Sequence, residues 1–263
     1  MSRSRTAVFA AAGSLAGAGV ALAGTRALLQ RQAAVARRRI GKPLGEDAID
    51  ADRVWRRSRG GDPLELLVLG DSIAAGLGAL RRKETLGARV AKGLAKRLQR
   101  PVRLRTAAVV GAETSMLAAQ LGGLPPAYRP DVAVIVVGGN DVTHRVPVRV
   151  SIAHLEAAIG RLRTLGAEVV VGTCPDLGAL RPVPQPLRAL GGRQSRRLAT
   201  AQAAAALRLG ARPVSLRRAV GHLFVSRPDE MFSVDRFHPS ALGYRRTAEA
   251  LLPAVVAAVG HPD

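Results

Sequence analysis

The sequence has few aromatic residues, one cysteine and few acidic side chains. Phe, Trp and Tyr make up 3% of the 263 residues, so the core must consist mostly of Leu, Val and Ala. That scarcity also argues against the stacking platforms that bind single-stranded nucleic acid. Cys174 is the single cysteine, so no disulfide can form within the chain. No Cys and His residues have metal-ligand spacing, and the sequence implies neither a metal nor an organic cofactor.

Acidic residues are outnumbered by basic ones. The chain has 40 Lys and Arg against 19 Asp and Glu, which gives a formal net charge of +21. Most of the basic residues are arginines, they are scattered, and no helix-turn-helix or zinc-finger spacing accompanies them. This pattern indicates a compositional bias, so we expect no nucleic-acid partner. An anionic membrane surface is a partner that such a charge would suit, and the oligomeric state is left open.

The N-terminal segment differs in composition from the rest of the chain. Residues 7–24 carry no charge, whereas the residues before and after them are basic. This arrangement is typical of an export signal, with Ala21-Leu22-Ala23 as a cleavage site, and it is near the lower length limit of a membrane span. We predict a signal or anchor over residues 1–40 that places the domain outside the cytoplasm, membrane-anchored or secreted. The alternative is a soluble helix packed on a cytoplasmic protein.

The remaining chain divides into a short connection and one domain. Residues 41–62 contain Pro, Gly and mixed charges, which predicts a linker. Residues 63–263 are long enough for a single domain with a sizeable core.

The domain has the pattern of an α/β protein. The domain contains five short, continuous apolar runs, and such runs are typical of parallel strands covered on both faces. They are residues 65–70, 103–110, 131–137, 167–171 and 212–216. Helical patterns separate them, over 86–98, 152–165, 187–209 and 241–259. The alternation predicts a three-layer α/β/α sandwich. We expect Ser151 to cap the second helix and Pro253 to kink or interrupt the last.

Polar residues follow these predicted strands, at the edge where such sheets carry their chemistry. Ser72 follows the first strand, and a serine hydroxyl attacks an acyl group only when a base takes its proton. His238 could be that base, with Asp235 orienting it from three residues away on one predicted loop. The oxyanion formed on acyl transfer needs fixed hydrogen-bond donors. The backbone N–H groups of Ser72 and Gly111 and the side-chain amide of Asn140 could provide them.

Four sequence blocks together resemble a known family, the SGNH hydrolases, also called GDSL esterases/lipases. In order they are Gly70-Asp71-Ser72, Gly111, Gly138-Gly139-Asn140-Asp141 and Asp235-x-x-His238-Pro239-Ser240. The resemblance spans residues 65–259, with Ile73 where the family name implies Leu. It implies a flavodoxin-like fold with a five-stranded parallel sheet of order 2-1-3-4-5. It also implies Ser72 as nucleophile, His238 as base, Asp235 as its orienter, and Gly111 and Asn140 as oxyanion donors.

The resemblance implies a serine hydrolase acting on a carboxylic ester, either a small molecule or a lipid, and no cofactor. Acyl transfer, sugar O-deacetylation or a non-catalytic, membrane-tethered binding protein are the alternatives. An α/β-hydrolase is rejected because the chain lacks the G-x-S-x-G elbow. Gly76-Leu77-Gly78 could suggest nucleotide binding, but the third glycine of that fingerprint is replaced by Arg81. Cys174 and His144 are interpreted as structural.

Overall fold

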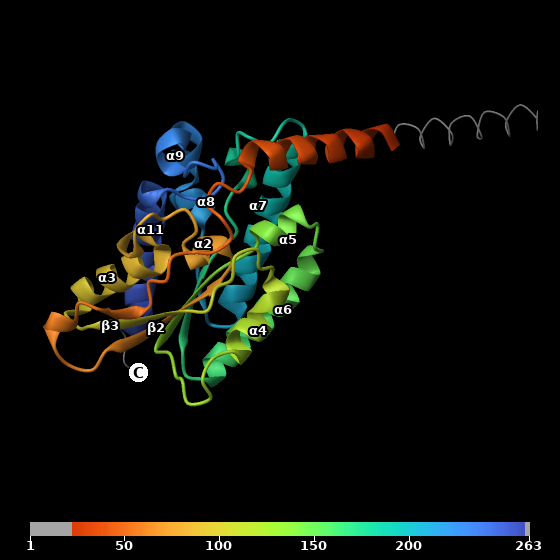
Figure 1. The fold of residues 1–263 in the computed structure, drawn as a ribbon. Coiled ribbons are helices and arrows are strands. Elements are labelled where there is room, and N and C mark those ends of the chain that lie inside the picture. Colours follow the sequence, from red (N-terminus) through yellow and green to blue (C-terminus); the bar gives the residue numbers. More distant parts are fainter. Residues whose placement is uncertain (1–22, 261–263) are drawn as a thin grey trace, which may run out of the picture.

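The computed structural model describes residues 23–260, which form one mixed sheet between two layers of helices (Figure 1). The strands are β1 (Arg53–Trp55), β2 (Leu64–Gly70), β3 (Val102–Thr106), β4 (Val132–Val136), β5 (Glu168–Gly172) and β6 (Arg212–Val214). Their order across the sheet is β1-β3-β2-β4-β5-β6. All neighbouring pairs are parallel except β1 and β3. Apart from β1, this is the predicted 2-1-3-4-5 order, so the predicted fold class is confirmed.

The edge strand β1 lies inside the segment predicted as a linker. It pairs with β3 in antiparallel register, with Arg53 opposite Leu104, and Ala51 just before it is buried in the core. The Asp52 carboxylate accepts a hydrogen bond from the backbone N–H of Thr106 at 2.9 Å. The linker prediction is therefore wrong for these residues, because backbone pairing to an open sheet edge needs no long apolar run.

The helices cover both faces of the sheet. They are α2 (Ser72–Ala75), α3 (Leu86–Leu98), α4 (Leu117–Gly122), α5 (Gly139–Thr143), α6 (Val148–Thr164), α7 (Leu187–Arg208), α8 (Leu216–Ala219), α9 (Gly221–Ser226), α10 (Pro228–Met231) and α11 (Ala241–Val259). Side chains of α3 and α11 form one core cluster with the sheet, and those of α4, α6 and α7 form a second on its other face. The predicted three layers follow directly, since the central strands β2, β4 and β5 bury side chains on both faces.

Three local predictions need correction. Helix α6 begins at Val148, so Ser151 is not its cap; the Ser151 hydroxyl is buried and donates to Asp141 instead. Helix α11 continues through Pro253 to Val259, so the predicted interruption is wrong. Tertiary packing of its apolar face against α3 and the sheet offsets the backbone hydrogen bond that proline cannot donate. The second strand ends at Thr106 rather than at residue 110.

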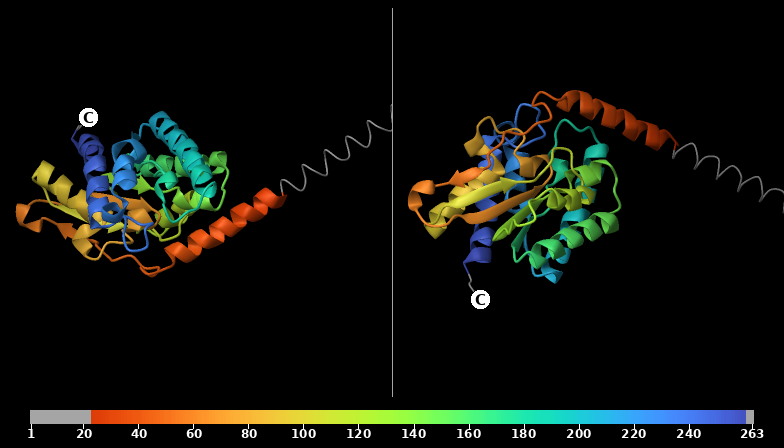
Figure 2. Two further views of the ribbon diagram at one scale, coloured as in Figure 1. Left: turned by 90° about the horizontal axis from the view of Figure 1, so that it is seen from above. Right: turned by 60° about the horizontal axis from the view of Figure 1, so that its bottom comes forward.

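A helix over residues 23–40 precedes the domain and lies against it at its residue-40 end, while its other end leads away (Figure 2). In this described part of the chain, no helix is long and apolar enough to cross a membrane. Residues 1–22, which hold most of the predicted signal or anchor, lie outside the described residues.

Candidate active site

The turn between β2 and α2 presents Ser72. Gly70 ends the strand with φ +132°, and a Cβ there would lie 1.8 Å from the carbonyl oxygen of Val136, so only glycine fits. The Asp71 carboxylate then caps α2 by accepting from the backbone N–H of Ile73 at 2.9 Å. Ser72 is thereby the first residue of α2 and is only 7% exposed.

The loop between α10 and α11 brings Asp235 and His238 to this serine. One carboxylate oxygen of Asp235 accepts from the backbone N–H groups of Phe237 and His238, at 2.9 and 3.0 Å. Its other oxygen lies 2.6 Å from His238 Nδ1. His238 Nε2 lies 2.9 Å from Ser72 Oγ. The three residues predicted to act together are therefore connected in a continuous chain of hydrogen bonds.

The buried carboxylates of Asp71 and Asp235 differ in their electrostatics. Burial acts to raise the pKa of Asp235, but the hydrogen bonds from His238 and from the Phe237 and His238 backbone outweigh it, so that pKa lies below its usual value. Burial raises the pKa of Asp71 to about 6, and the hydrogen bond from Ile73 offsets only part of this effect. Asp235 thus stays ionised beside the imidazole, whereas Asp71 gains and loses its proton near pH 6.

Gly111 and Asn140 line the same cavity as His238. Gly111 has φ +82° and no atom within 4 Å of where a Cβ would be, so its backbone borders open space. Asn140 is the second residue of α5, and its side-chain nitrogen donates to the carbonyl of Ala112 at 2.9 Å. Because an amide nitrogen carries two hydrogens, one donor of Asn140 remains after that bond is made.

Asp141 fastens the Gly111 loop to the helical layer. Its buried carboxylate accepts from the backbone N–H of Thr114 at 3.1 Å and from the Ser151 hydroxyl at 2.7 Å. The Thr114 hydroxyl also donates to it. Asp141 therefore braces the loop.

Two buried glutamines, which sequence reasoning missed, hold the strand ends. Gln120 binds both backbone groups of Gly70, accepting from its N–H at 2.9 Å and donating to its carbonyl at 2.8 Å. Gln202 accepts from the N–H of Cys174 at 2.7 Å and donates to the carbonyl of Val137 at 2.9 Å. The sequence gives only a weak indication of them, namely a single glutamine on an otherwise apolar helix face. A buried amide in such a place needs hydrogen-bond partners.

The glycine that suggested nucleotide binding has a packing role. A Cβ at Gly78 would lie 2.6 Å from the carbonyl oxygen of Pro239 and 3.3 Å from the Cβ of His238. Its φ of +103° also favours glycine. The loop after α2 therefore approaches the histidine loop closely, and this contact accounts for Gly78 without a phosphate ligand.

Cys174 and His144, which the sequence analysis interprets as structural, lie in different environments near the site. Cys174 is buried, and burial raises the pKa of its thiol well above the usual value, so the reactive thiolate is disfavoured. His144 is largely exposed, and its Nδ1 lies 2.7 Å from Glu113 Oε1. In the described part of the chain, no cluster of His, Cys, Asp or Glu could hold a metal ion.

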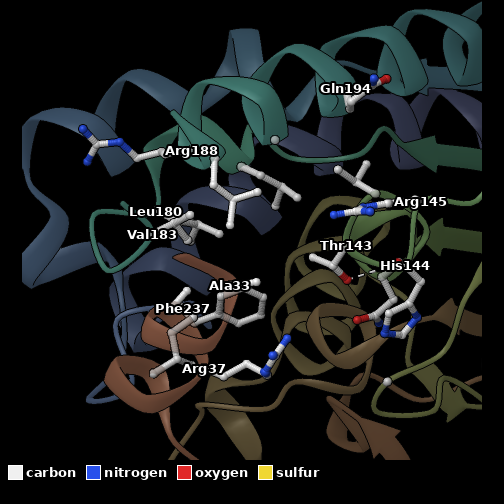
Figure 3. A pocket seen from close by; sticks show the side chains of 18 of the residues that line it. Ala33, Arg37, Thr143, His144, Arg145, Leu180, Val183, Arg188, Gln194 and Phe237 are labelled. Atoms are coloured by element: carbon white, nitrogen blue, oxygen red, sulfur yellow. Dashed lines mark hydrogen bonds between the residues drawn. The ribbon is translucent and has the colours of Figure 1, made fainter. Parts of the chain in front are cut away.

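Two hollows meet at His238. A small one of about 70 Å³ is bordered by Ser72 and by apolar side chains that include Leu216 and Phe232. A large one of about 1540 Å³ lies between helix 23–40 and the domain (Figure 3). It reaches His238, Asn140 and Gly111. A substrate bound at the Ser72 hydroxyl could thus extend in two directions.

Comparison with known proteins identifies the family. Residues 68–246 match the GDSL-like lipase/acylhydrolase family. The chain belongs to this family. A relative, the GDSL-like esterase Rv1075c of Mycobacterium tuberculosis (strain ATCC 25618 / H37Rv), is 41% identical over 271 residues, covering 97% of this chain and 84% of the relative. The predicted family and enzyme class, a hydrolase of ester bonds, are confirmed.

Solved structures agree on the fold. LAE5, a hydrolase from the metagenome of Lake Arreo, Spain, matches with a TM-score of 0.61 at 20% identity, covering 76% of this chain and 98% of LAE5. A catalytic mutant of Axe2, an acetylxylan esterase from Geobacillus stearothermophilus, matches with a TM-score of 0.59 at 20% identity. It covers 75% of this chain and 96% of Axe2.

Proposed function

We propose that this GDSL-like hydrolase cleaves carboxylic esters through a Ser72-His238-Asp235 triad. The observation that carries the proposal is the unbroken contact from Ser72 Oγ to His238 Nε2 (2.9 Å) and from His238 Nδ1 to Asp235 (2.6 Å). His238 takes the hydroxyl proton as Ser72 Oγ attacks the ester carbonyl carbon. The ionised Asp235 holds the imidazole tautomer and stabilises its positive charge.

The tetrahedral intermediate is stabilised and then collapses to an acyl-enzyme, which water hydrolyses. Its oxyanion accepts hydrogen bonds from the backbone N–H groups of Ser72 and Gly111 and from the Asn140 side chain. Collapse breaks the bond to the alcohol, which leaves with the proton from His238 and gives an acyl-Ser72. Water, deprotonated by His238, attacks this acyl-enzyme, releases the carboxylic acid and restores Ser72.

The proposal also covers the class of substrate and the location of the domain in the cell. The predicted N-terminal signal or anchor favours a lipid or cell-envelope ester and an extracytoplasmic domain at a membrane surface. Sugar O-deacetylation is a second candidate, because the Axe2 neighbour is described as an acetylxylan esterase. Both reactions, and acyl transfer to an alcohol, would use the same triad.

The test is hydrolysis of p-nitrophenyl esters, acetate through palmitate, by the full chain and by Ser72→Ala. We expect turnover that vanishes in the variant while its melting temperature is unchanged. Ser115→Ala, an exposed serine near the Gly111 loop, is the matched control and should retain full activity. Wild-type-like turnover by Ser72→Ala would overturn the mechanism.

A fluorophosphonate probe provides a second test that needs no substrate. It should label the wild type on the peptide containing Ser72 and leave Ser72→Ala unlabelled. Labelling at another serine would assign the nucleophile elsewhere.

A further inference from the structure

The wall of the large cavity comes partly from outside the family domain. Residues 68–246 match the family, whereas Leu29, Ala33, Ala36 and Ile40 line the cavity from helix 23–40. Their spacing of three and four residues places them on one helix face. That face looks across the cavity at apolar side chains of the domain, namely Leu177, Leu180, Val183, Leu187, Leu190 and Phe237.

Specific hydrogen bonds fix the helix over the segment that precedes α7. Gln32 binds at two points, with its side-chain nitrogen donating to the carbonyl of Gln185 and its side-chain oxygen accepting from the N–H of Leu187, the first residue of α7, at 3.0 Å. Arg39 donates to the carbonyl of Pro182 at 3.4 Å. The helix is therefore a built wall of the cavity, with polar contacts that set its register.

The cavity also carries uncompensated positive charge. Arg37 from the helix and Arg145 from the opposite wall direct their guanidinium groups into the space between them (Figure 3). Within residues 23–260, neither arginine makes an ion pair with a carboxylate. By contrast, the acidic residues that line the cavity are paired, Glu46 with Lys42 and Asp235 with His238.

Arg145 is placed there by unusual backbone geometry. It has φ +62°, in the left-handed region that non-glycine residues rarely adopt. Its backbone N–H donates to the carbonyl of Val142 at 3.2 Å, which closes the turn after α5. Left-handed residues commonly end helices, and here the helix end sets the position of a guanidinium group three residues past Val142.

We propose that this cavity binds a part of the ester substrate that combines an apolar chain with an anionic group, a phosphate or a carboxylate. The chain lies along the face of helix 23–40, and Arg37 and Arg145 bind the anion by charge-assisted hydrogen bonds. The volume of about 1540 Å³ exceeds the roughly 300–1,000 Å³ of ordinary ligand pockets, so a long amphiphile fits. The inference rests on the proposed function in placing the reacting ester bond at Ser72.

Competitive inhibition tests the site with a defined probe. Decyl phosphate, used below its aggregation concentration, should inhibit p-nitrophenyl acetate hydrolysis competitively. The double variant Arg37→Gln/Arg145→Gln should raise its inhibition constant tenfold or more. Arg97→Gln, an exposed arginine on α3 on the other face of the sheet, should leave it unchanged. Equal inhibition constants for the wild type and the double variant would overturn the charge assignment.

Further inhibition measurements test the apolar chain and the anionic group of the ligand separately. 1-Decanol should inhibit more weakly than decyl phosphate and equally in the wild type and the double variant. Inorganic phosphate should not inhibit at the same concentration; if it matches decyl phosphate, the site binds a free anion and the amphiphile is wrong. Ala33→Trp, which fills the apolar face, should weaken decyl phosphate inhibition tenfold or more, and its melting curve should match that of the wild type. Unchanged inhibition in this variant would remove helix 23–40 from the site.

Calorimetric binding of decyl phosphate to Ser72→Ala distinguishes this inference from the proposed function. Binding that persists, with a weaker constant after Arg37→Gln/Arg145→Gln, supports the cavity site even if Ser72 is not the nucleophile. A triad that behaves as proposed together with no binding of decyl phosphate would overturn the cavity assignment alone.

Discussion

The turn that presents Ser72 and the helix over residues 23–40 border the same space but are held very differently. At the turn, Gln120 binds both backbone groups of Gly70. On the adjoining histidine loop, Asp235 accepts three hydrogen bonds. Helix 23–40 is attached through the side chains of Gln32 and Arg39 and an apolar face. The hydrogen bonds at the turn fix the atoms proposed to react, whereas helix 23–40 shapes the cavity through which a substrate approaches them.

The two regions are therefore expected to affect different steps, the turn the chemical reaction and the helix the binding of large substrates. The groups proposed to react lie in the family region, where a displacement of about 1 Å can cost a factor of roughly 10² in rate. The helix lies outside that region, and a change there alters only contacts to remote parts of a substrate. We therefore expect variants at the turn to lower kcat and variants in the helix to change KM for large substrates.

The largest effect is expected at the turn. His238→Ala should lower kcat by about 10⁴–10⁶-fold, because the base that activates Ser72 is lost, and should leave the melting temperature nearly unchanged. The measurement is p-nitrophenyl acetate hydrolysis, with His222→Ala, an exposed histidine on α9, as the matched control. A loss below about tenfold would mean that His238 is not the base.

A smaller effect is expected from Asn140, which is proposed as one oxyanion donor. Asn140→Ala should lower kcat by roughly 10²–10³-fold, with KM for p-nitrophenyl acetate little changed, since the lost bond forms mainly in the transition state. Steady-state kinetics beside a melting curve measure this. A change confined to KM would assign Asn140 to substrate binding instead.

The ionisation of Asp71 should make the free energy of unfolding depend on pH. Its pKa in the folded protein is about 6, against an ordinary 3.8, so the folded state holds a proton that the unfolded chain has lost. The free energy of unfolding should therefore fall as pH rises from about 4 to about 6, by on the order of 1–3 kcal/mol, and this contribution should be constant above that range.

Asp71→Asn should abolish this part of the pH dependence, because asparagine caps a helix as well as aspartate does but cannot ionise. Urea unfolding between pH 4 and pH 7 is the measurement, and Asp229→Asn, at an exposed position, is the control. An unchanged pH slope in Asp71→Asn would mean that Asp71 is ionised throughout this range.

The smallest effect is expected in the helix. Gln32→Ala removes the two hydrogen bonds to Gln185 and Leu187, each worth about 1 kcal/mol. KM for p-nitrophenyl decanoate should rise severalfold, while kcat/KM for the acetate stays the same. Gln30→Ala, exposed on the same helix, is the control. Equal losses on both esters would show that the helix supports the reacting groups themselves.

Much of the site was predictable because it depends on short-range rules. A strand that ends in Gly70-Asp71-Ser72 requires a glycine turn and a helix cap, and both are local in sequence. Asp235 and His238 lie three residues apart, so one loop sets their contact. Gln120 and Gln202 were not predictable in this way, because their backbone partners lie 50 and 28 residues distant along the chain.

The sequence by itself determined five strands of the sheet and the residues that follow their ends, because apolar runs and strand ends are local features; the strand order was implied by the resemblance to the SGNH hydrolases. Only the tertiary structure decided where residues 23–40 and 53–55 lie. Their short, mixed sequences carry no pattern that specifies a partner. Their positions depend on what the folded domain offers: an unpaired edge of β3, and an apolar face with free backbone groups before α7. For that reason the catalytic chemistry can be inferred from the sequence, and the shape of the space around it cannot.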